Sequence, residues 1–188
     1  MTSEEKILVA AEARVRTGGY NGFSFRDLAR DTALTSAGVH HYFPTKADLV
    51  ARLTRNYTSR FLDALDECPS HARVARLREL FAESLRQDGK MCICGLLAAE
   101  SGGLPEPVTA AAKMFFAALV DRLVSAFPDS DDPLSDALAV LATLEGAALL
   151  ATVQGDPDVF EKATAALGSQ RSFTAFYQNY RFADKADF

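Results

Sequence analysis

The chain has 188 residues, is 48% hydrophobic and carries a net charge of −5, which fits an ordinary soluble protein of one or two domains. Its start, MTSEEKIL, lacks the apolar segment of a secretory signal, and three cysteines are too few for a disulfide framework. These features favour a cytoplasmic protein over a secreted, disulfide-rich one.

The first predicted helix extends from Thr2 to the pair Gly18-Gly19. Thr2 is followed three residues later by Glu5, a capping-box pattern in which each side chain binds a free backbone N–H at the helix start. Apolar residues spaced by four positions form its inward face: Ile7, Ala11 and Val15.

Residues 24–48 contain three helix starts. Ser24 and Thr45 are each followed three residues later by an aspartate, so each can begin a helix with a capping pattern. Thr35 or Ser36 can cap a short helix between them, and Pro44 ends that helix because the residue before a proline disfavours the helical conformation. A helix, a tight turn and a second short helix have the layout of a DNA-reading helix-turn-helix.

The charge distribution is compatible with that interpretation. Residues 1–60 hold nine Lys and Arg against six Asp and Glu, a net charge of +3, whereas residues 61–188 hold eleven against nineteen, a net charge of −8. A positive N-terminal module on an acidic body suits phosphate binding that is confined to the module.

The remaining pattern is helical, with no sustained strand alternation. We therefore predict an all-α fold of about nine helices, with a helix-turn-helix domain at residues 1–50 and a helical ligand-binding and dimerisation domain at residues 51–188. The later helices are predicted at residues 46–67, 71–88, 92–101, 105–127, from after 133 to 154, and from 156 to about 180.

The last two predicted helices are informative together. The apolar run Ala137 to Val153 contains Glu145 and is too short for a membrane span, so we predict a helix that is buried on all sides and no membrane partner. The final helix carries several aromatics: Phe160, Phe173, Phe176, Tyr177 and Tyr180. The pair forms either the core of a monomer or a subunit interface, where aromatic residues are enriched.

Residues 35–43, the reading helix, carry the candidate DNA contacts. Thr35 and Ser36 are short donors, and Gly38 permits close approach of the backbone to DNA. His40, His41 and Tyr42 offer ring donors and flat faces, and Lys46 at the next helix start suits a phosphate. The alternative is that the histidines are merely solvated and that Tyr42 belongs to the core.

These residues carry a resemblance to a known family. The run from Gly18 to Ser24, Leu28-Ala29, and the run from Thr35 to Leu49 resemble the N-terminal signature of TetR-family transcriptional regulators. The resemblance implies an all-helical homodimer whose last two helices form the interface. It also implies that a small-molecule inducer of unknown identity releases double-stranded operator DNA.

The resemblance also assigns positions. Ser24 matches a phosphate-contacting cap, and the other matching positions commonly meet DNA: Thr35, Ser36, His40, His41, Tyr42 and Lys46. Two positions depart from the family pattern: Ala33 stands in the turn where glycine is usual, and Ser36 stands where a basic residue is common. If Ala33 has a positive φ, it costs of order 1 kcal/mol.

The segment from Lys90 to Glu100 contains Cys92 and Cys94. It resembles a TetR subgroup that responds to electrophiles and oxidants through a cysteine at the start of the sixth helix, and Cys92 matches that position. A thiolate is favoured at a helix start and by the neighbouring Lys90. The alternatives are a buried thiol that packs like alanine, or a Cys-x-Cys metal site, for which His71 is the only distant nitrogen candidate. Cys94 serves as a resolving partner only with strain, because side chains two apart on a helix diverge.

Two acids and one aromatic are further effector candidates. Glu145 and Glu100 lie in apolar surroundings and can anchor a ligand, face solvent or pair across an interface. Phe115 suits either the core or a pocket wall. No catalytic, cofactor or metal motif stands out. The two competing functions are therefore an effector-responsive repressor and a thiol-based redox enzyme or peroxide scavenger, which a peroxide-turnover assay distinguishes.

Overall fold

The computed structural model describes residues 1–167, and every regular element within them is helical. This confirms the predicted all-α fold with a helix-turn-helix head and a helical body. The α-helices are α1 (Ser3–Gly18), α2 (Phe25–Thr32), α3 (Ser36–Tyr42), α4 (Lys46–Asp66), α5 (Arg73–Asp88), α6 (Ile93–Ala99), α7 (Glu106–Val124), α8 (Pro133–Gln154) and α9 (Pro157–Ala163). Short 3-10 turns occur at Tyr20–Gly22, Ser70–Ala72 and Ser101–Gly103.

The predicted helix starts are present in the head. Capping boxes form at Thr2, Ser24 and Thr45, where each hydroxyl accepts from the N–H three residues later and the acid at that position binds back. Thr35 begins α3 by accepting from the Gly38 N–H at 3.0 Å. These bonds satisfy N–H groups that a helix leaves unpaired at its start.

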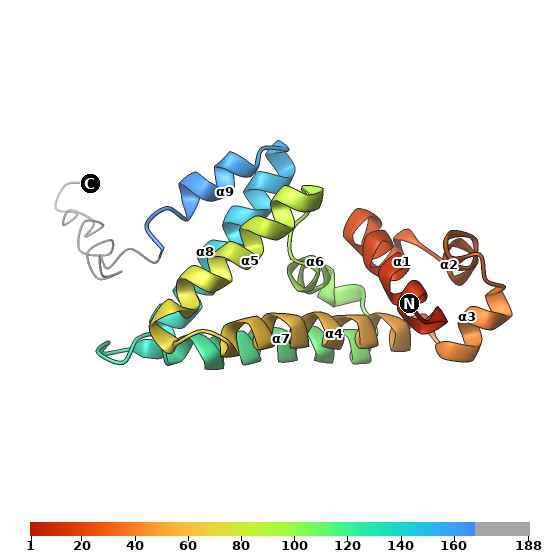
Figure 1. Cartoon of the computed structure of the whole chain (residues 1–188), viewed down its shortest axis with the longest axis horizontal. Helices are drawn as coiled ribbons and strands as arrows, with labels where there is room; N and C mark the ends of the chain where they lie inside the picture. Colours follow the sequence, from red (N-terminus) through yellow and green to blue (C-terminus); the bar gives the residue numbers. More distant parts are fainter. Residues whose placement is uncertain (168–188) are drawn as a thin grey trace, which may run out of the picture.

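The molecule is elongated, with α1–α3 forming a head at one end and α5, α8 and α9 lying at the other (Figure 1). The α4 helix begins in the head and continues along α7, so it belongs to both parts. The shared core contains an aromatic cluster in which the Tyr57 ring lies 4.7 Å from Phe61 and 5.8 Å from Phe115. Because this core is continuous, a change in the body can reach the head through α4.

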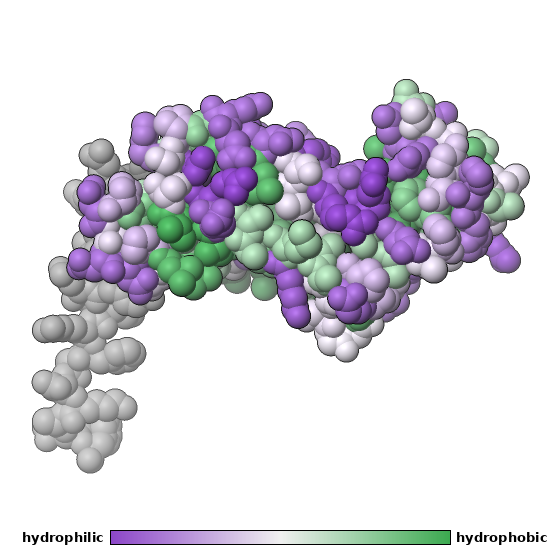
Figure 2. Space-filling view, turned by 90° about the horizontal axis from the view of Figure 1, so that it is seen from below, coloured by the Kyte–Doolittle hydropathy of each residue, from purple (hydrophilic) through white to green (hydrophobic). Residues whose placement is uncertain are grey.

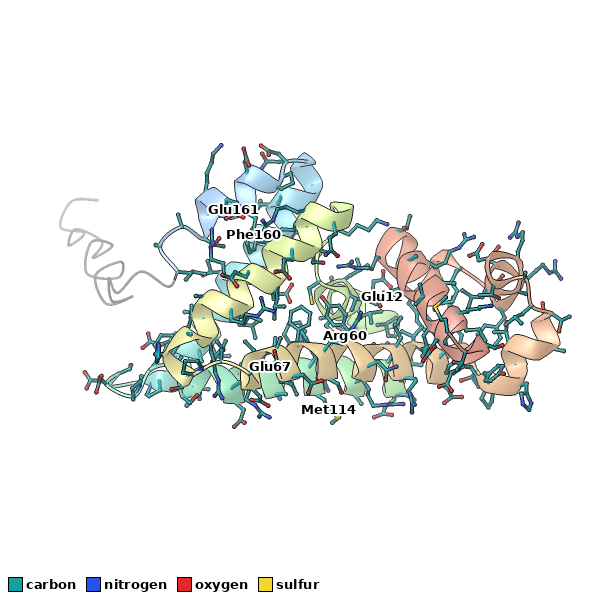
Figure 3. All side chains as sticks on the ribbon, in the orientation of Figure 1. Glu12, Arg60, Glu67, Met114, Phe160 and Glu161 are labelled. Carbon is teal, nitrogen blue, oxygen red and sulfur yellow. The ribbon has the colours of Figure 1, made fainter. Side chains whose placement is uncertain are left out.

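Specific contacts connect the remaining helices, and Figure 3 shows several of them. Arg60 on α4 bonds Glu12 on α1 at 2.9 Å, which joins the two helices across the head. Arg78 on α5 binds Glu161 on α9, and the Phe160 ring stacks on Phe81 at 6.4 Å. These contacts hold α9 against α5.

The prediction that α8 is buried on all sides was wrong for the described residues. One face is buried, as shown by Leu144 and Ala148, which are both 0% exposed. Another carries apolar side chains that are half or more exposed: Leu134, Leu138, Leu149, Leu150 and Val153. By length and composition alone α8 could cross a membrane, but it packs on α5, α7 and α9 in a helical domain. Hydrophobic residues gather on the body in Figure 2.

The last helix is shorter than predicted within the described residues. Asp156 caps α9 as expected, accepting from the Asp158 N–H at 2.9 Å. The helix ends at Ala163, and turns follow to residue 167. The predicted aromatic positions Phe173, Phe176, Tyr177 and Tyr180 lie outside the described residues.

Candidate nucleic-acid interface and ligand pocket

The α3 helix has a buried side that packs in the head and a polar side that faces solvent. Val39 is 0% exposed and anchors the helix in the head core. Thr35, Ser36 and His41 are exposed on the other side, and so is Tyr42 at 42%. Gly38 is half-buried beside the Thr35 cap, and Ser24 is exposed at the start of α2. This face combines short donors with rings of longer reach, as base and phosphate contacts require.

The two histidines of α3 differ in their contacts. The His40 ring meets Phe25 edge-on at 4.5 Å, and its Nδ1 lies 3.3 Å from the Pro44 carbonyl oxygen. His41 instead contacts Tyr42, with 5.4 Å between ring centroids. His40 is exposed but already contacts two groups of the head, whereas His41 and Tyr42 contact each other on the outer side.

Lys46 turns into the head in this structure. Its ammonium donates to the Phe23 carbonyl oxygen and lies over the rings of Tyr20 and Phe23, at 4.8 and 4.3 Å from their centroids. Burial lowers the pKa of Lys46, although the Asp27 and Glu100 carboxylates oppose that shift. To contact a phosphate, this side chain would have to leave these partners.

The turn before α3 contains the strain that the sequence suggested. Ala33 has φ 56° and ψ 30°, the left-handed conformation, and it is the one non-glycine residue with positive φ in the described part of the chain. A methyl group at this position costs of order 1 kcal/mol relative to glycine.

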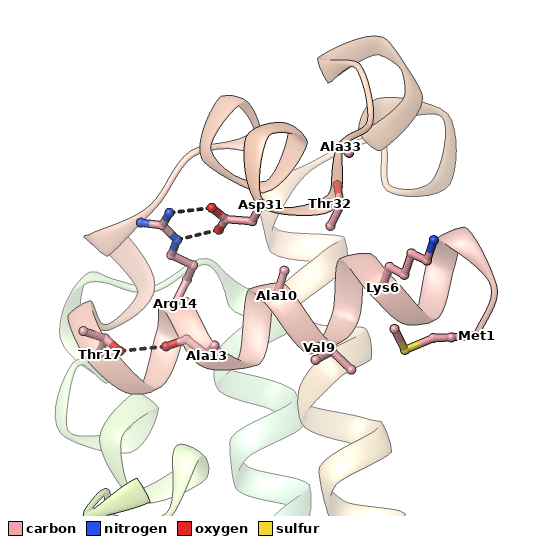
Figure 4. Close-up of a pocket in the computed structure, with 10 residues that line it drawn as sticks. All are labelled: Met1, Lys6, Val9, Ala10, Ala13, Arg14, Thr17, Asp31, Thr32 and Ala33. Carbon is pink, nitrogen blue, oxygen red and sulfur yellow. Dashed lines mark hydrogen bonds and ion pairs between the residues drawn. The ribbon is translucent and has the colours of Figure 1, made fainter.

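A surface groove between α1 and α2 lies beside this turn (Figure 4). Across it the Arg14 guanidinium donates two hydrogen bonds to the Asp31 carboxylate, each 2.8 Å long. This bidentate pair lowers the pKa of Asp31 through the Arg14 hydrogen bond. It fixes α2, and with it the turn into α3, against α1.

The head touches the body at the end of α6. The Glu100 carboxylate accepts a 3.0 Å hydrogen bond from the Tyr20 N–H. Gly19 makes this approach possible, because a Cβ there would lie 1.8 Å from Glu100 Oε1. Lys90 donates to the Thr17 hydroxyl at 2.8 Å, and Arg16 donates to Ser84 and to a backbone carbonyl of the body.

A pocket of about 590 Å³ lies between α6, α7 and α8. Leu96 on α6, Phe116 and Val120 on α7, and Leu141 and Leu149 on α8 form part of its apolar wall. Glu145 is the single ionisable residue among the described residues of its lining. Pockets of this size and composition suit small molecules.

Glu145 occupies an unusual position in that pocket. Both carboxylate oxygens are buried, and neither has a hydrogen-bond partner of regular geometry. The carboxylate lies against the bare backbone of Gly95, where a Cβ would come within 2.3 Å of Oε2. Burial and, secondarily, the nearby Cys92 raise the pKa of Glu145 to about 10.

Comparison with known proteins agrees with this architecture. Residues 7–53 match the model for bacterial regulatory proteins of the tetR family, and residues 70–166 match that for the C-terminal domain of LmrA/YxaF-like transcriptional regulators. The chain belongs to the TetR family. No curated protein sequence matches it significantly.

Solved TetR-family structures share the fold along most of their length. A transcriptional regulator from Legionella pneumophila is 27% identical with a TM-score of 0.82, covering 88% of this chain and 95% of the other. One from Agrobacterium tumefaciens is 26% identical with a TM-score of 0.81, covering 87% and 94%. The reduced form of E. coli NemR is 20% identical with a TM-score of 0.76, covering 87% and 93%, which shows the fold alone.

Two cysteines of this TetR-family chain, Cys92 and Cys94, lie close to Glu145 of the pocket. Cys92 is the N-cap of α6 and is only 2% exposed. Burial opposes its thiolate, but the Cys94 thiol, the Gly95 N–H and the Tyr57 hydroxyl favour it and lower the pKa of Cys92 to about 7. Burial and, secondarily, the neighbouring Cys92 raise the pKa of Cys94.

The surroundings of Cys92 and Lys90 bear on two expectations about this segment. Cys92 precedes the helix with an extended ψ of 131°, so its side chain can interact with Cys94 despite the spacing of two residues. Lys90 donates to the Thr17 hydroxyl on α1 at 2.8 Å, which places its ammonium at the junction of head and body.

The remaining effector candidates separate in space. Glu145 lines the pocket, Phe115 is fully buried in the aromatic core, and Glu100 binds the head. Sequence reasoning did not assign Phe116 or Gly95 to the pocket. A signal for Gly95 was available, since a glycine inside a predicted helix can mark a close approach of another group.

Proposed function

We propose that this protein is a transcriptional repressor that binds a palindromic operator as a homodimer and is released by a small-molecule effector. The observation that carries the proposal is the position of α6. Gly95, Leu96 and Ala99 line the pocket, and the next residue, Glu100, binds the backbone of the head. One seven-residue helix thus connects an effector site to the reading head.

The DNA contacts that we propose follow the exposed face of α3. Thr35, Ser36, His41 and Tyr42 meet base edges and phosphates in the major groove, and Gly38 permits close approach of the backbone. His40 contributes from the end of the helix, and Ser24 contacts a phosphate from the start of α2. Lys46 contacts a phosphate only after it leaves Phe23, so we expect it to contribute less than Tyr42.

The homodimer uses the exposed apolar side chains of α8. Leu150 and Val153 are 52% and 78% exposed, and an isolated subunit would leave them in water. A twofold interface here places one reading helix in each of two successive major grooves, about 34–36 Å apart. Family membership supports both the dimer and the palindrome.

The test begins with selection of an operator from fragmented genomic DNA by the purified protein. Fluorescence anisotropy then gives the affinity of wild type, Tyr42→Ala and the double variant Thr35→Ala/Ser36→Ala. We expect a loss of at least about tenfold in each variant, equivalent to about 1.4 kcal/mol. Met114→Ala is the matched control because Met114 is 63% exposed on α7, far from the head.

Two results would contradict the assignment. One is undiminished operator binding by both reading-helix variants with an unchanged melting temperature. The other is affinity that does not fall as salt is raised from 50 to 200 mM, since a protein that neutralises phosphates loses roughly tenfold or more over such a range.

Release through a thiol is a second form of the same function. Its support is the pKa of Cys92, lowered to about 7, so that a thiolate is available near neutral pH. The proposed chemistry is addition of the Cys92 thiolate to an electrophile such as a quinone, with Cys94 as its neighbour. We expect quinone treatment to release the operator from wild type and from Cys68→Ser. Cys92→Ser should keep its operator after the same treatment. If Cys92→Ser still responds fully, Cys92 is structural.

A further inference from the structure

Glu145 has no structural partner that accounts for its burial. A buried carboxylate without a hydrogen-bond partner costs several kcal/mol as an anion, and such groups are normally paired with a cation or a metal. Among residues 1–167, no arginine, lysine or histidine lines this pocket. With no counter-charge among the described residues, Glu145 keeps its proton in the empty pocket, and it can ionise there only when a cation enters.

The surroundings hold the carboxylate at the pocket rather than letting it turn to water. Because Gly95 has no side chain, Oε2 occupies the space that a Cβ would need. The methyl group of Met91 lies 3.1 Å from that Cβ position. Leu96, Phe116 and Leu149 supply apolar surface around it. An acid in the wall of an apolar pocket suits a ligand that has a cationic end to bind the acid and an apolar body to contact the other lining residues.

We propose that the pocket between α6, α7 and α8 is a receptor for a protonated amine on an apolar or aromatic body, whose N–H groups bind the Glu145 carboxylate. This assignment rests on the proposed function, because it names the chemical class of the effector. An amine supplies the missing charge and several donors, so both unpartnered oxygens gain hydrogen bonds.

Other ligand classes fit the site less well. A carboxylate or phosphate would bring a negative charge into an apolar pocket whose described lining offers no cation, which disfavours binding. A neutral alcohol or ketone can share one hydrogen bond with a protonated Glu145, but it cannot stabilise the anion. Within the described part of the chain, the ionisable group that acts on the pKa of Glu145 is Cys92, which raises this pKa as a negative charge does.

The experiment uses three probes that share one aromatic body: 9-anthracenylmethylamine, 9-anthracenylmethanol and 9-anthracenecarboxylic acid. Binding to the full-length dimer without DNA is measured by fluorescence at pH 7.5. We expect the amine to bind at least about tenfold more tightly than the alcohol, and the acid to bind weakest. In Glu145→Gln the amine should lose its advantage while the alcohol binds as before.

The matched control is Glu106→Gln, because Glu106 is an exposed glutamate at the start of α7 and does not line the pocket. It should leave the preference for the amine intact. If Glu145→Gln does not fold, Gly95→Ala gives a second test, since its Cβ displaces the carboxylate and should also reduce the preference for the amine.

The outcomes separate this inference from the repressor proposal. Equal binding of amine and alcohol, or an amine preference that survives in Glu145→Gln, would overturn the amine receptor and leave operator binding untouched. An amine preference that depends on Glu145, together with no effect of the amine on operator binding, would uphold the receptor and contradict its role as the inducer site.

Discussion

The head and the body of this molecule achieve order by different means. In the head, hydrogen bonds between polar groups fix the helices: capping boxes begin α2 and α4, and the Arg14–Asp31 pair joins α1 to α2. In the body, apolar packing predominates, and Glu145 and the exposed side chains of α8 remain without partners. The contrast indicates where each part acts, because a preformed polar face suits DNA and an unsatisfied site suits a ligand or a second subunit.

The largest expected effect tests the exposed face of α8. Leu150→Arg combined with Val153→Arg would place two charges in an interface where burial of unpaired charge is costly. We expect a monomer by sedimentation at micromolar concentration and a loss of operator affinity of about 100-fold or more, since a monomer holds only one half-site.

The control for this variant is Met114→Arg, which adds the same charge at an exposed site on α7. A charge at Ala148 would not test the interface, because Ala148 is buried within its own subunit. A double variant that still sediments as a dimer would place the subunit contact elsewhere.

The next effect concerns the junction between head and body. Gly19 has φ 68° and ψ −168°, and an added Cβ would meet the Glu100 carboxylate. Gly19→Ala should therefore lower the free energy of unfolding by about 1–3 kcal/mol, as measured by urea denaturation. Gly18→Ala is the matched control, because nothing lies within 4 Å of its added Cβ. Equal stability of the two variants would show that the Glu100 contact is dispensable.

The third effect is a pH dependence located in the body. The pKa of Glu145 is raised from 4.5 to about 10, so the folded state holds this proton more tightly than the unfolded state. Its contribution to stability is complete below about pH 4.5 and is lost progressively as pH rises toward 10. Between pH 6 and 9 wild type should lose several degrees of melting temperature more than Glu145→Gln, corresponding to about 1–3 kcal/mol. Parallel curves would mean that the carboxylate is ionised and solvated.

The smallest effect returns to the head. Ala33→Gly relieves the left-handed conformation and should raise the free energy of unfolding by about 0.5–1 kcal/mol. Ala37→Gly, at an exposed position inside α3, should lower it by about the same amount. Urea denaturation of both variants measures the difference, and a destabilised Ala33→Gly would show that the turn tolerates alanine without strain.

Sequence predicted the head better than the body for a physical reason. Caps such as Ser24 with Asp27 are local, so their spacing alone identifies the helix starts, and the strain at Ala33 follows from the same short segment. The inward turn of Lys46 was not predictable, because it depends on Phe23 and Tyr20 reaching the same side of the head.

The state of the body depends on tertiary geometry. Glu145 is buried against Gly95 because of how α6 lies on α8. The positions of these two residues in the sequence do not reveal that contact. Similarly, α8 is apolar on several faces, and composition could not show which one the other helices cover. The end of α9 at Ala163 was missed because aromatic residues continue the helical pattern beyond it.

The continuity of α4 sets a mechanical scale. Its 21 residues form one helix of about 32 Å at 1.5 Å per residue. A tilt of roughly 5° about its body end would move the head end by about 3 Å over that length. Because a second subunit would move in the opposite sense, the two reading helices would separate by about 6 Å, a sizeable fraction of the roughly 34 Å between successive major grooves. The helix is therefore a lever arm, and its length determines how small a displacement in the body suffices to misalign the pair.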